Sequence, residues 1–132
     1  MSTRKLVELS VQVPARPGEL TRVMQAASKG GVNILAFYGY NANPNEAFIR
    51  LVPDNEDKAK KALEEAGLSP KVSHVVAVTG EAGKGAGVKL CQKLSESGIN
   101  IEYAYASTPG TGSSTVIFKV SDADAALRVL KT

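Results

Sequence analysis

The chain opens with alternating apolar and polar positions and then changes to a helical spacing. Residues 7–13 place an apolar side chain at every second position, which predicts a half-buried β-strand. A break follows at residues 14–18, which contain two prolines and a glycine. Apolar residues then recur at the i, i+3, i+4, i+7 spacing of an amphipathic helix: Leu20, Val23, Met24 and Ala27. Gly30 and Gly31 predict the end of this helix, because glycine accepts the left-handed conformation common there.

The pattern continues with two strands and a second helix. Residues 32–40 and 47–52 are largely apolar, and the segment 41–45 between them has the composition of a turn. These two runs therefore predict a β-hairpin. A second helical stripe follows and is closed by Gly67: Ala59, Ala62, Leu63 and Ala66.

The chain then repeats itself. Gly31-Val32-Asn33-Ile34 recurs as Gly98-Ile99-Asn100-Ile101, an offset of 98 − 31 = 67 residues. This period is too long for a solenoid unit and suits a small domain. We expect two domains, residues 1–69 and 70–132, with any site between them present in two related copies. The same offset relates Val11 to Val78, Gly18 to Gly85, Arg22 to Lys89 and Tyr38 to Tyr105.

The second half repeats the order of elements. Strands are predicted at 72–79, at 99–105 with Ile99, Ile101, Tyr103 and Tyr105 on one face, and at 115–120; the loop 107–113 is longer than its counterpart. A glycine-rich turn occupies residues 80–87. The two helical stripes are Gly87, Leu90, Cys91 and Leu94, then Ala123, Ala126, Leu127 and Leu130.

Each half is thus strand, helix, strand, strand, helix, one strand short of the ferredoxin-like βαββαβ unit. The second half has no residues left for a closing strand, so the halves are expected to share strands or to complete one another. The predicted fold class is α+β, with two ferredoxin-like repeats packed as a pseudo-symmetric pair with antiparallel sheets.

Composition and charge narrow the function. The net charge of +3 is spread evenly, with 9 basic and 8 acidic residues in 1–67 and 7 and 5 in 68–132. Nucleic-acid binding usually needs a concentrated basic face, so we expect no nucleic-acid partner. One cysteine and one histidine leave little material for catalysis, and we expect no metal site, no cofactor and no enzyme activity. Cys91 is expected to be a buried, reduced thiol.

No apolar run reaches the length of a membrane span, so we expect a cytoplasmic protein with no membrane partner. The glycine-rich turn is not a P-loop, since Lys84 is followed by Gly85 and not by Ser or Thr. Asn33 and Asn100 are more informative. Each amide offers a donor and an acceptor to a small zwitterion, or else bonds to the local backbone of a turn. Spacing alone leaves both alternatives open.

Two of these motifs resemble a known family. Arg16-Pro17-Gly18-Glu19-Leu20, followed by a helix and Gly31-Val32-Asn33-Ile34, is similar to the amino-acid-binding ACT domain of bacterial phosphoglycerate dehydrogenases. The second half, through Gly98-Ile99-Asn100-Ile101-Glu102, resembles the regulatory region of aspartate kinases. The resemblance covers nearly the whole chain. It implies a ferredoxin-like fold, paired domains and a small effector, usually an amino acid, bound between them.

The resemblance also implies the binding elements, which are the loop before the first helix of one repeat and the start of the second strand of its partner. If the halves pair within the chain, the first loop faces Asn100 and Ile101, and the second loop faces Asn33 and Ile34. Where the dehydrogenase loop carries an asparagine two residues before its proline, this chain has Ala15, matched by Ala82. The loop residues are Ala15, Arg16, Pro17, Gly18, Glu19 and Leu20, and Ala82, Gly83, Lys84, Gly85, Ala86 and Gly87.

The expected function is therefore a non-catalytic regulatory module that binds an amino acid between its ACT repeats. Unpaired edges of small sheets are often covered by a second chain, so a homodimer is expected. A metabolic enzyme or a transporter is the partner expected for such a module. The alternative is a ligand-free assembly subunit that docks onto a metabolic enzyme. An RNA-recognition module shares the βαββαβ order, but the first predicted strand has no aromatic residue and the third has only Phe48.

Overall fold

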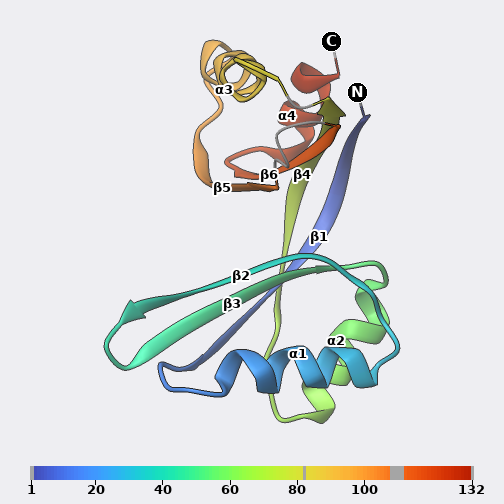
Figure 1. Cartoon of the computed structure of the whole chain (residues 1–132), viewed down its shortest axis with the longest axis vertical. Coiled ribbons are helices and arrows are strands. Elements are labelled where there is room, and N and C mark those ends of the chain that lie inside the picture. The colour runs from blue at the N-terminus through green and yellow to red at the C-terminus, as the bar shows by residue number, and fades with distance from the viewer. Residues whose placement is uncertain (1, 82, 108–111, 132) are drawn as a thin grey trace. The chain divides into compact units, whose positions relative to one another are not determined.

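The computed structural model describes residues 2–81, 83–107 and 112–131 (Figure 1). In chain order its elements are β1 (Ser2–Pro14), α1 (Glu19–Lys29), β2 (Ile34–Asn43), β3 (Glu46–Pro53), α2 (Glu56–Glu65), β4 (Lys71–Glu81), α3 (Ala86–Glu96), β5 (Ile101–Ser107), β6 (Ser113–Val120) and α4 (Ala123–Leu130). Every helix and strand predicted from the apolar spacing is present, in the predicted order.

The chain divides into two compact units. The first unit is Val7–Ser73, and the second unit combines Met1–Leu6 with His74–Thr132. The strands follow the hydrogen-bonded order β2-β3-β1-β4-β6-β5, and the pairs with a defined register are antiparallel. The expected division at residue 69 was drawn from the repeat, and as a domain boundary it stays a prediction.

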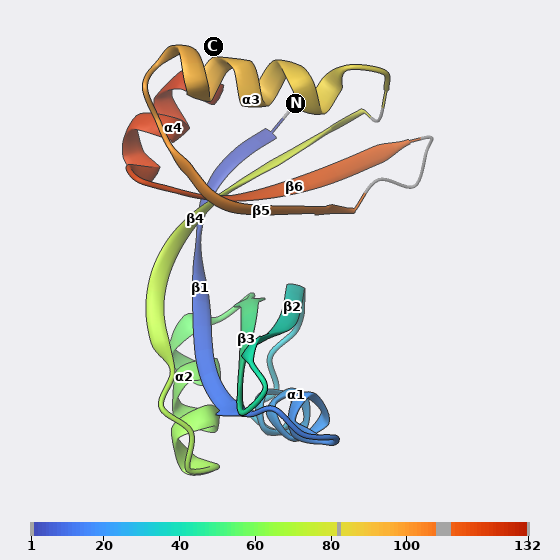
Figure 2. The ribbon, with the colours of Figure 1, turned by 90° about the vertical axis from the view of Figure 1, so that its left-hand side faces the viewer.

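The strand order explains how each unit obtains four strands. In the first unit, β2, β3 and β1 are followed by the beginning of β4. In the second unit, β5, β6 and β4 are followed by residues 2–6 of β1, which lie beside β4 in Figure 2. Each unit therefore has the ferredoxin-like order, with its fourth strand supplied by the first strand of the other half. The expectation that the halves share strands is confirmed.

Strand β1 begins five residues earlier than the alternation predicts. Residues 2–6 hold Arg4 and Lys5 and show no apolar alternation. Thr3 and Leu6 are only half-buried and the other residues of this segment are exposed, so it has no buried apolar stripe that a period of two could reveal. Its position depends on β4, about seventy residues away in the sequence, which no local pattern reports.

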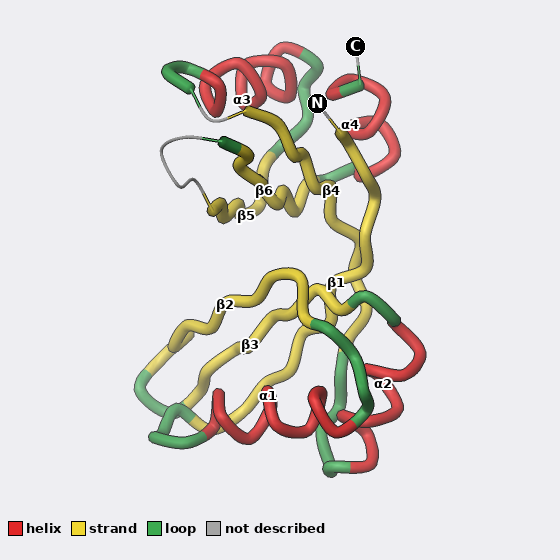
Figure 3. Tube along the Cα trace, turned by 45° about the vertical axis from the view of Figure 1, so that its right-hand side comes forward, coloured by secondary structure: helices red, strands yellow, loops and turns green. Residues whose placement is uncertain are grey.

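The first unit buries a layer between its sheet and its two helices, which cover one face of the sheet in Figure 3. The register sets Leu9 opposite Leu51 and Val11 opposite Ile49, so their side chains point to the same face. Val23 of α1 and Leu63 of α2 are completely buried against this face. The complete buried cluster is Leu9, Val11, Val13, Val23, Ala26, Ala27, Ala47, Ile49, Leu51, Ala59, Leu63 and Leu68.

The second unit repeats this construction with α3 and α4. Val76 lies opposite Phe118, and both side chains are buried. Leu94 of α3 and Leu130 of α4 are completely buried against them. The complete buried cluster is Val76, Val78, Leu90, Leu94, Ile99, Phe118, Val120, Ala126 and Leu130. The two cores are aliphatic, as the low aromatic content predicts.

Four positions of the predicted helical stripes are wrong, because Leu20, Ala66, Gly87 and Cys91 are exposed. Leu20 is 41% exposed, because α1 begins at Glu19 and directs Glu19, Val23 and Ala26 inward instead. Cys91 is exposed, because Leu90 and Leu94 are the residues of α3 that face the sheet.

The predicted common face of Ile99, Ile101, Tyr103 and Tyr105 is also wrong. The pairing of β5 with β6 shifts its register between Ile101 and Tyr103. The shift leaves Ile101 packed against the helix-side core, while Tyr103 lies opposite Lys119 on the other face. Alternation cannot report such an irregularity, because an extra residue inverts every position that follows it.

The glycine pair at the end of α1 has two different roles. Gly31 has a φ of 74°, the left-handed conformation predicted at a helix end, whereas Gly30 has a φ of −74°. A Cβ on Gly30 would lie 2.8 Å from the Cβ of Ala62. Gly30 is therefore the point of close approach between α1 and α2.

Within the ranges that the structure covers, no helix has both the length and the apolar content needed to cross a bilayer.

Candidate functional site

The two helices that follow the first strand of each half begin in the same unusual way. Gly18 precedes α1 with a φ of 90°, and Gly85 precedes α3 with a φ of 76°, and neither helix has a side-chain cap. The other two helices are capped: Asn55 accepts from the amide of Lys58 at 3.1 Å, and Asp122 accepts from that of Ala125 at 3.0 Å. Uncapped N–H groups at a helix start are suited to hold an anionic group such as a carboxylate.

The first loop is held by its backbone. The amide of Ala15 donates to the carbonyl of Asn45 at 3.1 Å, and the amide of Arg16 donates to Pro14 at 3.0 Å. The Arg22 amide donates to the Gly18 carbonyl at 2.9 Å and starts the helix. The left-handed φ of Gly18 permits this tight entry, which a side chain would strain.

Glu19, at the start of α1, is a buried carboxylate that two arginines hold. Its side chain accepts from the Arg22 guanidinium at 3.0 and 3.3 Å, and Arg16 Nε lies 3.8 Å away. The Arg22 hydrogen bonds are the main cause that lowers the pKa of Glu19 below the ordinary value of 4.5. The charges of Arg22 and Arg16 add to this lowering, and burial opposes it.

Glu19→Gln is expected to destabilise the chain at neutral pH and to reduce its sensitivity to acid. Because the pKa of Glu19 is lowered on folding, its carboxylate stabilises the folded chain above pH 4.5, and this contribution is lost as the pH falls through the lowered value. Urea unfolding from pH 3 to 7 should show the two proteins converging at low pH. A difference that is constant with pH would contradict this role of the carboxylate.

Asn33 and Asn100 occupy matched positions before β2 and β5. The Asn33 amide donates to Asp54 Oδ1 at 3.0 Å, and the Asp54 amide donates back to the Asn33 carbonyl at 2.9 Å. In the second half the Asn100 amide donates to Ser121 Oγ at 3.2 Å, and the Ser121 amide donates back at 3.0 Å. Both backbones are therefore fixed by a residue at the end of the neighbouring strand.

The side-chain carboxamides of these two asparagines behave differently from their backbone amides. Both residues are exposed, and within the described ranges neither carboxamide makes a hydrogen bond. The local-turn alternative would use the carboxamide, whereas here only the main chain is used. A register shift follows Asn33 between Ile34 and Ala36, as one follows Asn100. Each half therefore presents a free carboxamide beside a strand irregularity.

A groove in the first unit brings part of the predicted site together. Its volume is about 560 Å³, and it lies between α1 and the start of β2. Leu20, which lies in the first turn of α1, lines it together with Asn33 and Ile34 from the strand start. The exposed positions of Leu20 and Phe37 are thus parts of this groove wall.

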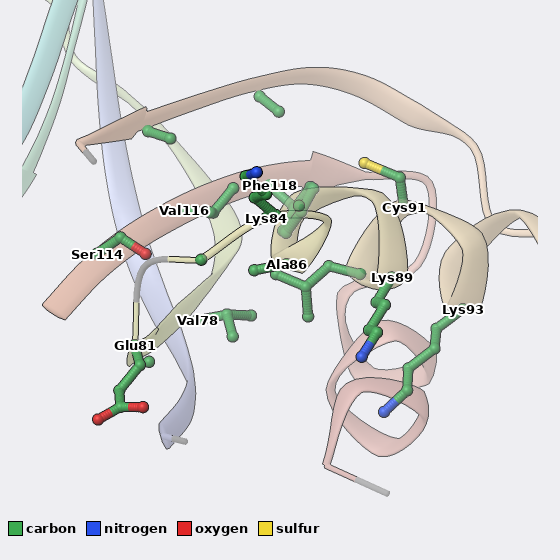
Figure 4. Close-up of a pocket in the computed structure, with 16 residues that line it drawn as sticks. Val78, Glu81, Lys84, Ala86, Lys89, Cys91, Lys93, Ser114, Val116 and Phe118 are labelled. Atoms are coloured by element: carbon green, nitrogen blue, oxygen red, sulfur yellow. The ribbon is translucent and has the colours of Figure 1, made fainter. Parts of the chain in front are cut away.

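A larger pocket lies in the second unit beneath the start of α3 (Figure 4). Its volume is about 900 Å³, and its wall combines the end of β4, the second loop, α3, β5 and β6. Its lining includes four of the five predicted second-loop residues that the structure describes: Gly83, Lys84, Ala86 and Gly87. Asn100 and Ile101 do not line it.

The structure therefore places the predicted loop and the predicted strand start of the same half in the same unit. Ala15, Arg16, Pro17, Gly18, Glu19 and Leu20 lie in the first unit with Asn33 and Ile34; Gly83, Lys84, Gly85, Ala86 and Gly87 lie in the second unit with Asn100 and Ile101. Ala82 lies outside the described residues, as does most of the loop 107–113. The pairing of each loop with the strand start of the other half stays a prediction.

Aromatic side chains on the first unit form a cluster that the sequence analysis missed. Tyr40 stacks on Tyr38 and on Phe48, each with a centroid separation of 5.8 Å. The Arg50 guanidinium lies over the Tyr40 and Phe48 rings and donates to the Tyr40 hydroxyl at 3.1 Å. Tyr38 and Tyr40 on β2 are two residues apart, as are Phe48 and Arg50 on β3. This spacing in the sequence was the signal that could have revealed the cluster. In the second half Tyr105 matches Tyr38, and Lys119 matches Arg50.

No group of three or more His, Cys, Asp or Glu side chains in the covered ranges is arranged to hold a metal ion. His74 is exposed on β4.

The model of one protein family matches residues 4–131, and its description is ACT domain pair. A solved structure from Bacteroides thetaiotaomicron is 27% identical, with a TM-score of 0.87, over 98% of this chain and 88% of that protein. The ligand-free regulatory subunit of aspartate kinase from Thermus thermophilus is 20% identical, with a TM-score of 0.71, over 99% of this chain and 95% of that protein. The corresponding subunit from Thermus flavus is 21% identical, with a TM-score of 0.64, over 99% and 95%.

No curated protein sequence matches the chain at a significant level. The family match spans both repeats and agrees with the duplicated ferredoxin-like order of the strands. The chain therefore belongs to the family of ACT domain pairs, which are regulatory modules.

Proposed function

We propose that this protein is a non-catalytic, amino-acid-binding regulatory module of the cytoplasm. The observation that carries the proposal is a matched pair of binding elements. Each half has a helix that starts at a left-handed glycine without a side-chain cap, and each has an asparagine whose carboxamide bonds no described residue. Polar groups left open at equivalent places in two copies of a fold are what a small zwitterionic ligand needs.

The helix starts and the asparagines bind different groups of the amino acid. The uncapped N–H groups at the start of α1 and α3 bind the carboxylate of the amino acid. The Asn33 and Asn100 carboxamides then accept from its ammonium group or donate to its carboxylate. We propose that each loop works with the strand start of another repeat, so that the ligand lies between repeats.

Regulation follows from linkage. A ligand that contacts two repeats binds most tightly when both are correctly placed, and it shifts the population toward that arrangement by its difference in affinity. A second protein that recognises the same arrangement then binds more tightly by the same factor. A metabolic enzyme or a transporter is the partner proposed for this step.

A second copy of the chain is proposed to complete the assembly. Strands β2 and β5 are the first and last in the hydrogen-bonded order, so each has an edge without a described neighbour. Residues 34–43 of β2 contain no charged side chain and no proline, the features that usually protect an edge strand. A homodimer that covers the edge of β2 explains why this edge is unprotected.

The proposal predicts that one or a few of the twenty amino acids stabilise the chain. At one hundred times its dissociation constant, a ligand specific to the folded state adds about 2.7 kcal/mol to the free energy of unfolding. The corresponding rise in Tm is about 10 °C for a chain of this size. Thermal unfolding at millimolar amino acid measures it, and light scattering on the same samples gives the number of copies.

Asn33→Ala and Asn100→Ala are expected to weaken the binding without changing the Tm of the free protein. Asn41→Ala, on the exposed part of β2, is the matched control and should leave binding unchanged. An unchanged Tm with each of the twenty amino acids at millimolar concentration would refute amino-acid sensing.

One observation favours a second candidate, a ligand-free assembly subunit that docks onto a metabolic enzyme. Ala15 stands at the place where related loops carry asparagine, and it packs against the first core, so it offers no side-chain polar group. Purification in complex with an enzyme, together with no response to any amino acid, would select this candidate.

A further inference from the structure

The pocket of the second unit is apolar in its depth and large enough for a whole amino acid. Val78, Leu90 and Phe118 form its inner wall, and all three belong to the buried core. Its volume of about 900 Å³ falls within the range of about 300–1,000 Å³ typical of small-molecule sites. Figure 4 shows Val78 and Phe118 among the side chains that line this pocket.

The internal repeat explains why this space is open. With the offset of 67, Val13 of the first half becomes Gly80, and Glu19 becomes Ala86. Val13 and Glu19 are buried, at 3% and 6% exposure, so in the first unit they occupy interior space. Leu20 and Phe37 likewise become Gly87 and Ala104. Four smaller residues, all of which line the pocket, therefore stand where the first half has larger ones.

Charged groups of both signs line the same pocket. Lys84 and Lys89 lie on the loop and the first turn of α3, and Glu81 lies at the end of β4. None of the three makes an ion pair with a described residue. A free ammonium and a free carboxylate complement the two charges of a zwitterion, while the depth of the pocket offers only apolar contact.

We propose that this pocket binds an amino acid with a large aliphatic side chain, such as leucine or isoleucine. The inference rests on the proposed function and names the class of ligand taken by the second loop. The ligand carboxylate lies at the uncapped start of α3 beside Lys84 or Lys89, its ammonium lies against Glu81, and its side chain packs on Val78 and Phe118. A polar side chain there would lose its hydration without gaining a hydrogen bond, which disfavours it.

Calorimetric titration of the full chain tests this assignment. Leucine is expected to bind about 10- to 50-fold more tightly than alanine, because it adds three carbons and each buried CH₂ contributes about 0.8 kcal/mol. 4-Methyl-2-oxopentanoate lacks the ammonium, and 3-methylbutylamine lacks the carboxylate, so both should bind at least tenfold more weakly than leucine. Tight binding of lysine, threonine or serine with none of leucine would overturn the inference and leave the proposed function standing. Silence toward every amino acid would overturn both.

Pocket-filling variants locate the site. Gly87→Leu restores the residue of the first half at a helical position where a new Cβ meets no atom within 4 Å. It should stabilise the free protein, since leucine favours a helix over glycine, and reduce leucine affinity at least tenfold. Val88→Leu adds bulk at the next residue, which is 60% exposed and outside the pocket, and should leave affinity unchanged.

A second filling variant makes the test independent of the loop. Ala104→Phe restores Phe37 of the first half from strand β5 and should also reduce leucine affinity at least tenfold. Unchanged affinity in both Gly87→Leu and Ala104→Phe would place the aliphatic ligand elsewhere and overturn the assignment.

Discussion

Leu63→Ala and Leu130→Ala are each expected to lower the free energy of unfolding by about 2–5 kcal/mol. The two leucines occupy equivalent places in the repeat, since 130 − 63 = 67, and both are completely buried. Leu63 packs from α2 against the sheet of the first unit, and Leu130 packs from α4 against that of the second. Each truncation leaves a cavity that close-packed neighbours fill only partly.

Urea denaturation measures the total loss, and amide hydrogen exchange assigns it to a unit. Each variant should release protection first in its own unit. Lys61→Ala, on the exposed side of the same helix as Leu63, is the control and should stay within about 0.5 kcal/mol of the parent. A loss below about 1 kcal/mol for either leucine would show that its core is not packed as described.

Deletion of residues 2–6 is expected to cost on the order of 3 kcal/mol or more, and to act on the second unit. These residues are the fourth strand of that unit, beside β4. Each backbone hydrogen bond lost contributes about 0.5–1.5 kcal/mol net, and the newly exposed edge of β4 adds to the loss. Hydrogen exchange should show faster exchange in β4 and β6 than in β3 of the first unit.

Lys5→Ala is the control for this deletion. It removes only the exposed ion pair between Lys5 Nζ and Asp124 Oδ1, 2.9 Å apart, and keeps the strand. It should therefore have a small effect on stability. If the deletion and Lys5→Ala behaved alike, residues 2–6 would not act as a strand of the second unit.

The local elements were predictable because their signals are local. Apolar spacing predicted each helix, and the residues of α2 and α4 that it placed inward include Ala59, Leu63, Ala126 and Leu130, all buried. The repeat predicted that the second half would copy the first. It also predicted that the halves share strands or complete one another, since each repeat is one strand short of the ferredoxin-like unit. The ACT resemblance is confirmed by the family match over residues 4–131.

The errors arose where a contact between particular side chains or strands overrides the apolar periodicity. Leu20 belongs to an apolar stripe by spacing, yet Glu19 takes the buried place because Arg22 and Arg16 neutralise it. Tyr103 and Ile101 should share a face, yet the register shift against β6 separates them. The burial of Glu19 and the face occupied by Tyr103 both depend on specific partner residues, which the spacing of apolar residues does not report.

The candidate site was likewise predicted only in part. The sequence identified the two glycine loops and the two asparagines, because these stand out in the repeat. It did not reveal the pocket beneath α3, although the substitutions that open it, such as Glu19 to Ala86 and Leu20 to Gly87, can be read in the aligned halves. A cavity is a relation among several elements, and only their packing shows that the missing side chains leave one continuous space.

By itself, then, the sequence determined the elements, the duplication and the family, because hydrophobic periodicity and matched glycine turns are properties of neighbouring residues. The tertiary structure decided that residues 2–6 complete the second unit and that α3 covers an open pocket. It also decided that the Asn33 and Asn100 carboxamides bond no described residue while their backbones are fixed. Each of these depends on hydrogen bonds and packing between residues far apart in the chain, and these form only when the whole unit folds.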